Sequence, residues 1–242
     1  PLPKPSMVSV FQTAGMMHAE ILFRRLFESN LHVPVETALS SFAAHIDVAT
    51  RKIYFIRHGE YDWHNPQSKD LTEIGVQQAE WTAKRLANLP AQKVYSSDLP
   101  RALQTAEIIR GAMGNVEYEI DAGLRECLLP IPSLSNVPLE VQKAGEQHAT
   151  AAFAKYMRPA EQKGESEIVV SHGNLIRYLI ARALGQADRW IQFRTLNCGI
   201  SEVHVESDGQ IWVVSYNDVG HLPAHLVTYG LPRQAYSTPA DV

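Results

Sequence analysis

The stretch KIYFIRHGE at residues 52–60 decides how this chain is expected to fold. After the lysine come Ile, Tyr, Phe and Ile, which is the composition of a buried β-strand. Arg57 and His58 follow where that strand would end, and Gly59 lets a ligand approach the backbone closely. The stretch therefore predicts a strand that delivers an arginine and a histidine to one edge of a sheet.

A second stretch of this kind, EIVVSHGN at residues 167–174, brings His172 to the end of another predicted strand. Carboxyl ends of parallel strands meet at one edge of an open α/β sheet, and such sheets bind ligands there. A single histidine at a strand end is more often structural. The pair, however, favours convergence of His58 and His172 on one site.

Strands and helices alternate from residue 51 onward. We predict strands over 52–56, 93–96, 116–120 and 167–171, helices over 72–89, 100–113, 139–157 and 174–184, and a closing hairpin of strands 198–206 and 210–216. Such alternation is typical of a mostly parallel sheet with helices on both faces. The predicted fold is a three-layer α/β/α domain over residues 51–242, with a C-terminal antiparallel hairpin.

Residues 1–50 differ from the rest and are predicted to form a helical N-terminal arm. An amphipathic pattern predicts one helix over residues 16–28, and a shorter helix is expected over residues 35–46. The arm either packs on the main domain or serves as a docking helix, for example in a homodimer. The sequence leaves both alternatives open.

Composition excludes several classes of protein. The chain of 242 residues is 45% hydrophobic and 20% charged, as expected for a soluble globular protein. Its net charge of −4 argues against nucleic acid or a membrane surface as partner, and no apolar run approaches the ~20 residues that span a bilayer. Cys127 and Cys198 form no paired motif, which suits a reducing compartment, so a cytoplasmic location is expected.

Two further side chains are candidates for the same site. Arg101 lies in the first turn of a predicted helix, where the helix dipole disfavours a cation unless an anion is bound nearby. A phosphate would also balance the positive charge of Arg57 beside His58, which can itself become cationic. Glu126 follows the third predicted strand, and a carboxyl near phosphate tends to stay protonated, as a general acid requires. The alternatives are a surface arginine and an ordinary loop acid.

No metal or other cofactor is expected. The chain has no HExxH motif and no cluster of Cys and His with zinc-ligand spacing. His221 and His225 are one helical turn apart, but Pro223 between them makes a helix unfavourable there. We therefore interpret both histidines as loop residues.

Five ordered segments carry a resemblance to a known family. They are RHGE at 57–60, LTEIG at 71–75, SSDLPRALQTA at 96–106, LRE at 124–126 and SHGN at 171–174. In this order they resemble the histidine phosphatase superfamily, which has the phosphoglycerate-mutase-like fold. NDVGHL at 217–222 is also similar to the closing segment of that family. NLIRY at 174–178 carries a narrower likeness to the mitochondrial protein serine/threonine phosphatases within it.

The resemblance implies a role for each aligned residue. His58 would attack phosphorus and form a covalent phosphohistidine. Arg57, Arg101 and His172 would bind the phosphoryl oxygens beside Gly59. Glu126 would protonate the leaving oxygen and then activate water, without a metal.

Departures from the family pattern limit what the resemblance implies. His64 stands where many relatives have a phosphate-contacting Asn, and Asn65 comes next, so either residue is a candidate for that contact. The mutases carry a basic run after the acid, whereas residues 127–132 are apolar, which disfavours mutase activity. The N-terminal arm also lacks the membrane helix and the tryptophan-rich assembly motif of the mitochondrial relatives, so membrane anchoring is not expected.

The expected function is therefore hydrolysis of phosphomonoesters, with a phosphorylated protein as the favoured substrate. The apolar, proline-containing loop over residues 128–138 suits a phosphopeptide or a bulky organic phosphate. The alternatives are a phosphatase of small phosphomonoesters, a phosphoglycerate mutase and a non-catalytic phosphate-binding module.

Overall fold

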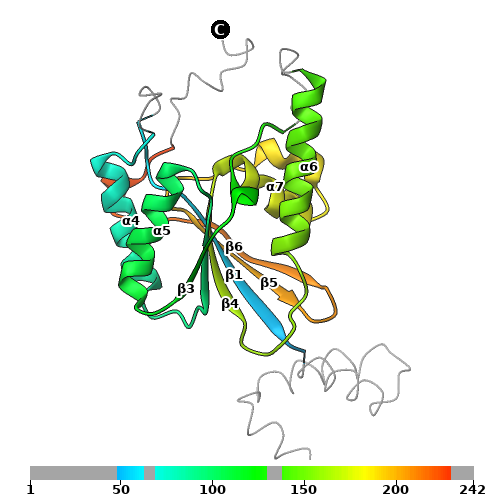
Figure 1. Cartoon of the computed structure of the whole chain (residues 1–242), viewed down its shortest axis with the longest axis horizontal. Helices are drawn as coiled ribbons and strands as arrows, with labels where there is room; N and C mark the ends of the chain where they lie inside the picture. The colour runs from blue at the N-terminus through cyan, green and yellow to red at the C-terminus, as the bar shows by residue number, and fades with distance from the viewer. Residues whose placement is uncertain (1–47, 63–68, 130–137, 230–242) are drawn as a thin grey trace, which may run out of the picture. The chain divides into compact units, whose positions relative to one another are not determined.

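The computed structural model describes residues 48–62, 69–129 and 138–229 (Figure 1). The helices predicted over residues 16–28 and 35–46 lie outside the described residues, as do His64 and Asn65. The division predicted at residue 50 stays a prediction.

A six-stranded sheet forms the centre of the described domain, in the order β3-β2-β4-β1-β5-β6. The strands are β1 (Thr50–Arg57), β2 (Lys93–Ser96), β3 (Glu117–Ile120), β4 (Ser166–Ser171), β5 (Ile200–Glu206) and β6 (Ile211–Asp218). Strands β3, β2, β4 and β1 pair in parallel, whereas β5 pairs antiparallel with both β1 and β6. The predicted mostly parallel sheet with a C-terminal antiparallel hairpin is confirmed.

Helices cover both faces of this sheet (Figure 1). Helices α4 (Glu73–Leu86) and α5 (Pro100–Met113) lie on one face, and α6 (Leu139–Tyr156) and α7 (Gly173–Ala183) lie on the other. Side chains alternate along β1, so Phe55 packs in the core under α6 and α7 while Ile56 packs in the core under α4 and α5. Three short 3₁₀ helices, which the sequence pattern did not predict, span Ala122–Leu124, Ala187–Gln192 and Ala224–Leu226.

Local chemistry explains where the elements begin and end. Thr72 caps α4 by accepting a hydrogen bond from the Gly75 N–H at 3.1 Å. This helix ends at Leu86, three residues before the predicted end, and is followed by a turn in which the Leu89 N–H donates to the Leu86 carbonyl at 2.9 Å. Pro90 disfavours helical backbone at Leu89. Helix α5 has the predicted bounds, with Pro100 in its first turn and Gly114 after its end.

Strand β5 begins at Ile200 and not at Cys198, where the hydrophobic pattern placed it. Cys198 has φ +55°, which is left-handed backbone that cannot continue a strand. Its N–H donates to the Arg57 carbonyl at 3.0 Å, at the end of β1. This turn therefore closes against the segment that carries the first histidine.

Candidate active site

Pairing of β1 with β4 brings the two predicted histidines together. Arg57 is in register with Ser171, so His58 and His172 follow side by side at the carboxyl edge of the sheet. Their ring centroids are 5.0 Å apart, and their exposed fractions are 2% and 0%. The pair therefore lies inside the protein at the edge where parallel sheets bind ligands.

The hydrogen bonds of His58 specify which ring nitrogen carries the proton. Nδ1 lies 2.7 Å from the Gly59 carbonyl oxygen, which accepts only from a protonated nitrogen. Nε2 accepts from the Nε–H of Arg101 at 3.1 Å, so it carries a lone pair. Burial holds the pKa of His58 well below its usual value, and His172, Arg57 and Arg101 lower it further. His58 is thus a neutral imidazole with Nε2 available as a nucleophile.

A hydrogen bond to Ser97 fixes the orientation of the His172 ring. Its Nε2 lies 2.8 Å from the Ser97 hydroxyl oxygen, and both side chains are completely buried. Nδ1 has no hydrogen-bond partner among the described residues, although it is buried. Because an unsatisfied buried nitrogen is unfavourable, this atom is suited to contact a bound ligand. Ser97 was not among the predicted site residues, although it lies in the same motif as Arg101.

Two buried arginines supply positive charge next to these histidines. Arg57, at the end of β1, donates through Nη1 to the carbonyls of Thr195 at 2.6 Å and Tyr229 at 3.1 Å. Arg101, in the first turn of α5, contacts His58, and its guanidinium lies 4.5 Å from the ring centroid of Tyr61. Two arginines beside two neutral histidines favour a dianionic ligand.

Gly59 has a role in packing that the sequence did not reveal. Its N–H donates to the Thr105 hydroxyl at 3.0 Å, and a Cβ at this position would lie 2.5 Å from the Gly75 carbonyl oxygen. A Cβ on Gly75 would collide with the Glu60 backbone. The two glycines therefore let α4 begin directly against the loop after β1. Contact of Gly59 with phosphate stays a prediction.

Glu126 reaches the site from the loop after the first 3₁₀ helix. Its carboxylate accepts from the backbone N–H of Cys127 at 3.3 Å and of Asn174 at 3.1 Å, at the start of α7. The residue as a whole is exposed to solvent. Its carboxyl group packs against the protein, and this partial loss of water raises its pKa. Arg57, the Cys127 N–H, Arg101 and Arg177 oppose this rise by favouring the charged form.

The preceding residue, Arg125, turns away and forms a two-pronged ion pair with Asp98 at 2.7 and 2.5 Å. This pair joins the loop that carries Glu126 to the turn before α5, and α5 carries Arg101.

Asn197 was also not predicted as a site residue. Its side-chain amide donates to the His58 carbonyl at 3.1 Å and so fixes the backbone of the first histidine.

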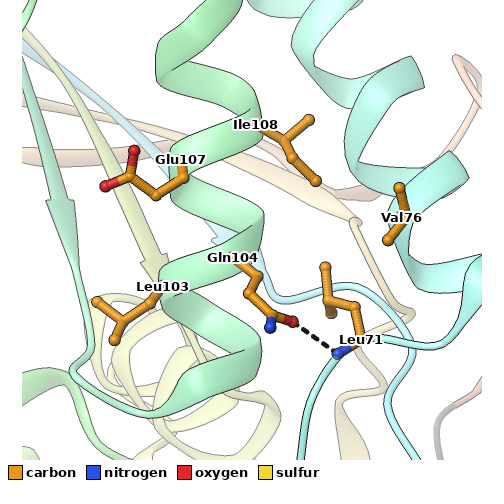
Figure 2. A pocket seen from close by; sticks show the side chains of 6 residues that line it. All are labelled: Leu71, Val76, Leu103, Gln104, Glu107 and Ile108. Carbon is orange, nitrogen blue, oxygen red and sulfur yellow. Dashed lines mark hydrogen bonds between the residues drawn. The ribbon is translucent and has the colours of Figure 1, made fainter.

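A surface cavity of about 410 Å³ lies away from these residues, between α4 and α5 (Figure 2). It is lined by Leu71, Val76, Leu103, Gln104, Glu107 and Ile108. Gln104 accepts a hydrogen bond from the Leu71 N–H there, and Glu107 is paired with Arg110. None of the five predicted catalytic side chains lines this cavity.

The remaining histidine and cysteine side chains considered as ligands or nucleophiles are hydrogen-bonded or buried. His221 Nε2 lies 2.9 Å from the Thr82 hydroxyl oxygen. Burial raises the pKa of the Cys127 and Cys198 thiols to about 12 each. Within the part of the chain that the structure describes, no three His, Cys, Asp or Glu side chains are grouped closely enough to hold a metal ion.

An open α/β sheet with a neutral histidine and two arginines at its carboxyl edge is suited to transfer of a phosphoryl group. The chain belongs to the histidine phosphatase superfamily, because the sequence model of branch 1 of that superfamily matches residues 53–131 and 136–219. It is a hydrolase of this class. The resemblance seen in the five motifs is confirmed.

Curated relatives support the assignment to phosphatases. The mitochondrial serine/threonine-protein phosphatase Pgam5 of Drosophila grimshawi is 31% identical over 214 residues, covering 81% of this chain and 73% of the relative. The mitochondrial serine/threonine-protein phosphatase PGAM5 of Rattus norvegicus is 33% identical over 192 residues, covering 74% and 67%.

Solved structures show the same fold. Phosphoglycerate mutase from Plasmodium falciparum is 28% identical, with a TM-score of 0.53, and the match covers 73% of this chain and 96% of that one. Phosphoserine phosphatase from Entamoeba histolytica is 25% identical, with a TM-score of 0.53 and coverage of 72% and 100%.

The predicted cytoplasmic location stays a prediction, because the named relatives are mitochondrial. In the described ranges, no helix combines the length and the apolar character needed to cross a bilayer.

Proposed function

We propose that this chain removes phosphate from protein phosphoserine and phosphothreonine, with His58 as the nucleophile. One observation supports the chemistry most directly. The Nδ1–H of His58 is bonded to the Gly59 carbonyl, so the Nε2 lone pair faces Arg101 in a buried, cationic site. A neutral imidazole held in this way attacks phosphorus without first losing a proton.

In the first step, His58 Nε2 forms a bond to phosphorus while the bond from phosphorus to the serine or threonine oxygen breaks. The Nε–H of Arg101 turns from Nε2 to a phosphoryl oxygen, and Arg57 and His172 Nδ1 bind the others. Protonated Glu126 gives its proton to the leaving oxygen. The products are the free hydroxyl, phosphohistidine and ionised Glu126.

In the second step, water attacks the phosphohistidine and Glu126 accepts the proton of that water. The bond between Nε2 and phosphorus breaks, and its electron pair returns to His58. Orthophosphate leaves, and Glu126 is protonated again. The backbone N–H groups of Cys127 and Asn174 support the ionised carboxylate between the two steps.

A protein substrate is supported by the named relatives and by an exposed apolar side chain close to Glu126 in sequence. Relatives between 30% and 33% identical are called serine/threonine-protein phosphatases. Leu128, two residues after Glu126, is 56% exposed and offers an apolar contact for a peptide. A phosphatase of small phosphomonoesters is the second candidate, because the solved phosphoserine phosphatase of Entamoeba histolytica is 25% identical.

A phosphoserine peptide and free phosphoserine should differ as substrates. We expect kcat/KM for a phosphoserine peptide to exceed that for free phosphoserine by about tenfold or more, because peptide contacts add binding energy in the transition state. We expect 3-phosphoglycerate to be hydrolysed slowly and not isomerised. Released orthophosphate is the measurement.

His58→Ala is the essential control, and activity should fall on the order of 10³-fold or more. His204→Ala, on β5 where the ring is paired with Glu202, should leave turnover unchanged. Unchanged turnover in His58→Ala would remove His58 as the nucleophile. Equal or better turnover of free phosphoserine would favour the small-molecule alternative.

A further inference from the structure

Tyr61 contacts two of the proposed catalytic residues at once. Its ring forms a T-shaped contact with the His58 imidazole, with centroids 5.4 Å apart and planes at 77°. Its face lies against Arg101, whose guanidinium carbon is 4.5 Å from the ring centroid. The ring therefore touches both the nucleophile and the cation that donates to it.

The backbone around Tyr61 is anchored to both neighbouring helices. Tyr61 forms an isolated antiparallel bridge with Leu71, whose N–H donates to Gln104 on α5 at 2.8 Å. The Glu60 N–H donates to Gln78 on α4 at 2.7 Å. The backbone that carries the ring is therefore tied to α4 and, through Leu71, to α5, the helix that carries Arg101.

An arginine side chain has many rotamers, and fixing one of them is entropically unfavourable. The face of an aromatic ring attracts a guanidinium through its quadrupole and restricts it to a parallel plane. Arg101 needs such a restriction that still allows movement. Its Nε–H must reach His58 in the resting enzyme and a phosphoryl oxygen during the reaction. Rotation within the plane over the ring satisfies both needs.

We propose that Tyr61 is a positioning residue of the phosphatase site, which holds the Arg101 guanidinium at His58 Nε2 and keeps it aligned for the phosphoryl group. This inference rests on the proposed function of His58 and Arg101. Tyr61 acts through Arg101, and the face of its aromatic ring makes the contact.

Besides Tyr61 itself, three charged or titratable groups act on His58 from the elements around it. They are Arg57 from β1, Arg101 from α5 and His172 from the turn between β4 and α7, and each lowers the pKa of His58. If the ring of Tyr61 is lost, Arg101 spends less time at His58. The pKa of His58 then rises, and affinity for phosphate falls.

The test measures resting-state properties of the full chain. NMR titration of the His58 ring and the Kd of inorganic phosphate are compared in wild type, Tyr61→Phe and Tyr61→Leu. We expect Tyr61→Phe to match wild type within about twofold, and Tyr61→Leu to raise the His58 pKa and weaken phosphate binding about tenfold. Leucine keeps most of the apolar cover over His58, so the difference reports on the ring.

A matched control exists at the edge of the sheet. Tyr118 on β3 lies under Arg110 at 5.1 Å, so Tyr118→Leu removes the same kind of contact far from His58 and should change neither quantity. A double-mutant cycle isolates the coupling: Tyr61→Leu should have no further effect on the His58 pKa when Arg101 is already Ala.

Two results would overturn the proposal. One is an unchanged His58 pKa and phosphate Kd in Tyr61→Leu. The other is a shift of the same size in the Arg101→Ala background, which would assign the effect to solvent exposure of His58. Neither measurement needs turnover, so a failure of the catalytic assignment, seen as full activity in His58→Ala, is separable from a failure of this inference.

Discussion

Burial acts on His58 and Glu126 in opposite directions, and both shifts serve the same reaction. Removing solvent favours the neutral form of any ionisable group, so it lowers the pKa of the His58 imidazole and raises that of the Glu126 carboxyl. A neutral histidine is the form that attacks phosphorus, and a protonated carboxyl is the form that donates to a leaving group. One site therefore shifts both pKa values toward the forms that a nucleophile and an acid require.

At this scale, Glu126→Gln tests the acid directly. Gln cannot donate an acidic proton, so kcat/KM for a phosphoserine peptide should fall about 10²- to 10³-fold. With p-nitrophenyl phosphate the leaving nitrophenolate is stable without a proton, and kcat/KM should change far less. An equal loss on both substrates would show that Glu126 acts by binding and not as an acid.

Among the elements, the start of α4 packs closely against the loop that follows β1. Gly59 and Gly75 allow the loop after β1 to lie directly on the first turn of this helix, and the Thr72 cap fixes where that turn begins. The sequence indicated a helix that begins near residue 72. It did not indicate the packing of the two glycines, because that contact joins segments that are not neighbours along the chain.

Gly75→Ala should therefore destabilise the fold. Its Cβ would collide with the Glu60 backbone, and overpacking of this kind lowers the free energy of unfolding by about 1–3 kcal/mol. Gly111→Ala on α5 is the matched control, because a Cβ there meets no atom within 4 Å. That change should stabilise the protein by about 0.5–1 kcal/mol. Urea unfolding of the two variants checks both signs, and a Gly75→Ala protein as stable as wild type would refute the packing argument.

For the whole molecule, the order of strands explains why the site is buried. Strand β1 lies between β4 and β5, so His58 is enclosed by the turn after β4 on one side and by the Cys198 turn before β5 on the other. Two histidines are kept in the neutral form at this place. The fold therefore holds two groups that would take up protons if the chain unfolded.

Stability should consequently fall as the pH falls below about 6.5, the pKa of histidine in an unfolded chain. The pKa values of His58 and His172 are lowered in the folded protein, so below this pH the unfolded state binds protons that the native state does not. Each such group changes the free energy of unfolding by up to about 1.4 kcal/mol per pH unit. The raised pKa of Glu126 acts in the other direction, because the native state then holds a proton that the unfolded state loses.

Urea unfolding at a series of pH values between about 7 and 5 measures this slope. His172→Gln should flatten the slope by about one proton, because glutamine does not titrate. A slope that is zero in wild type, or that stays the same in His172→Gln, would contradict the assignment of neutral buried histidines.

The sequence by itself determined the alternation of strands and helices, the end of one strand at Ser171, the end of another to within one residue of Arg57, and the family. These features depend on local signals such as hydrophobic runs and short ordered motifs, which are readable along a short window. The tertiary structure alone decided that Arg101 donates to His58 Nε2 and that Ser97 supports His172. The partner residues in these contacts are 43 and 75 positions apart in sequence. Burial and long-range packing set such contacts and the pKa shifts that follow, and neither is a local property of the chain.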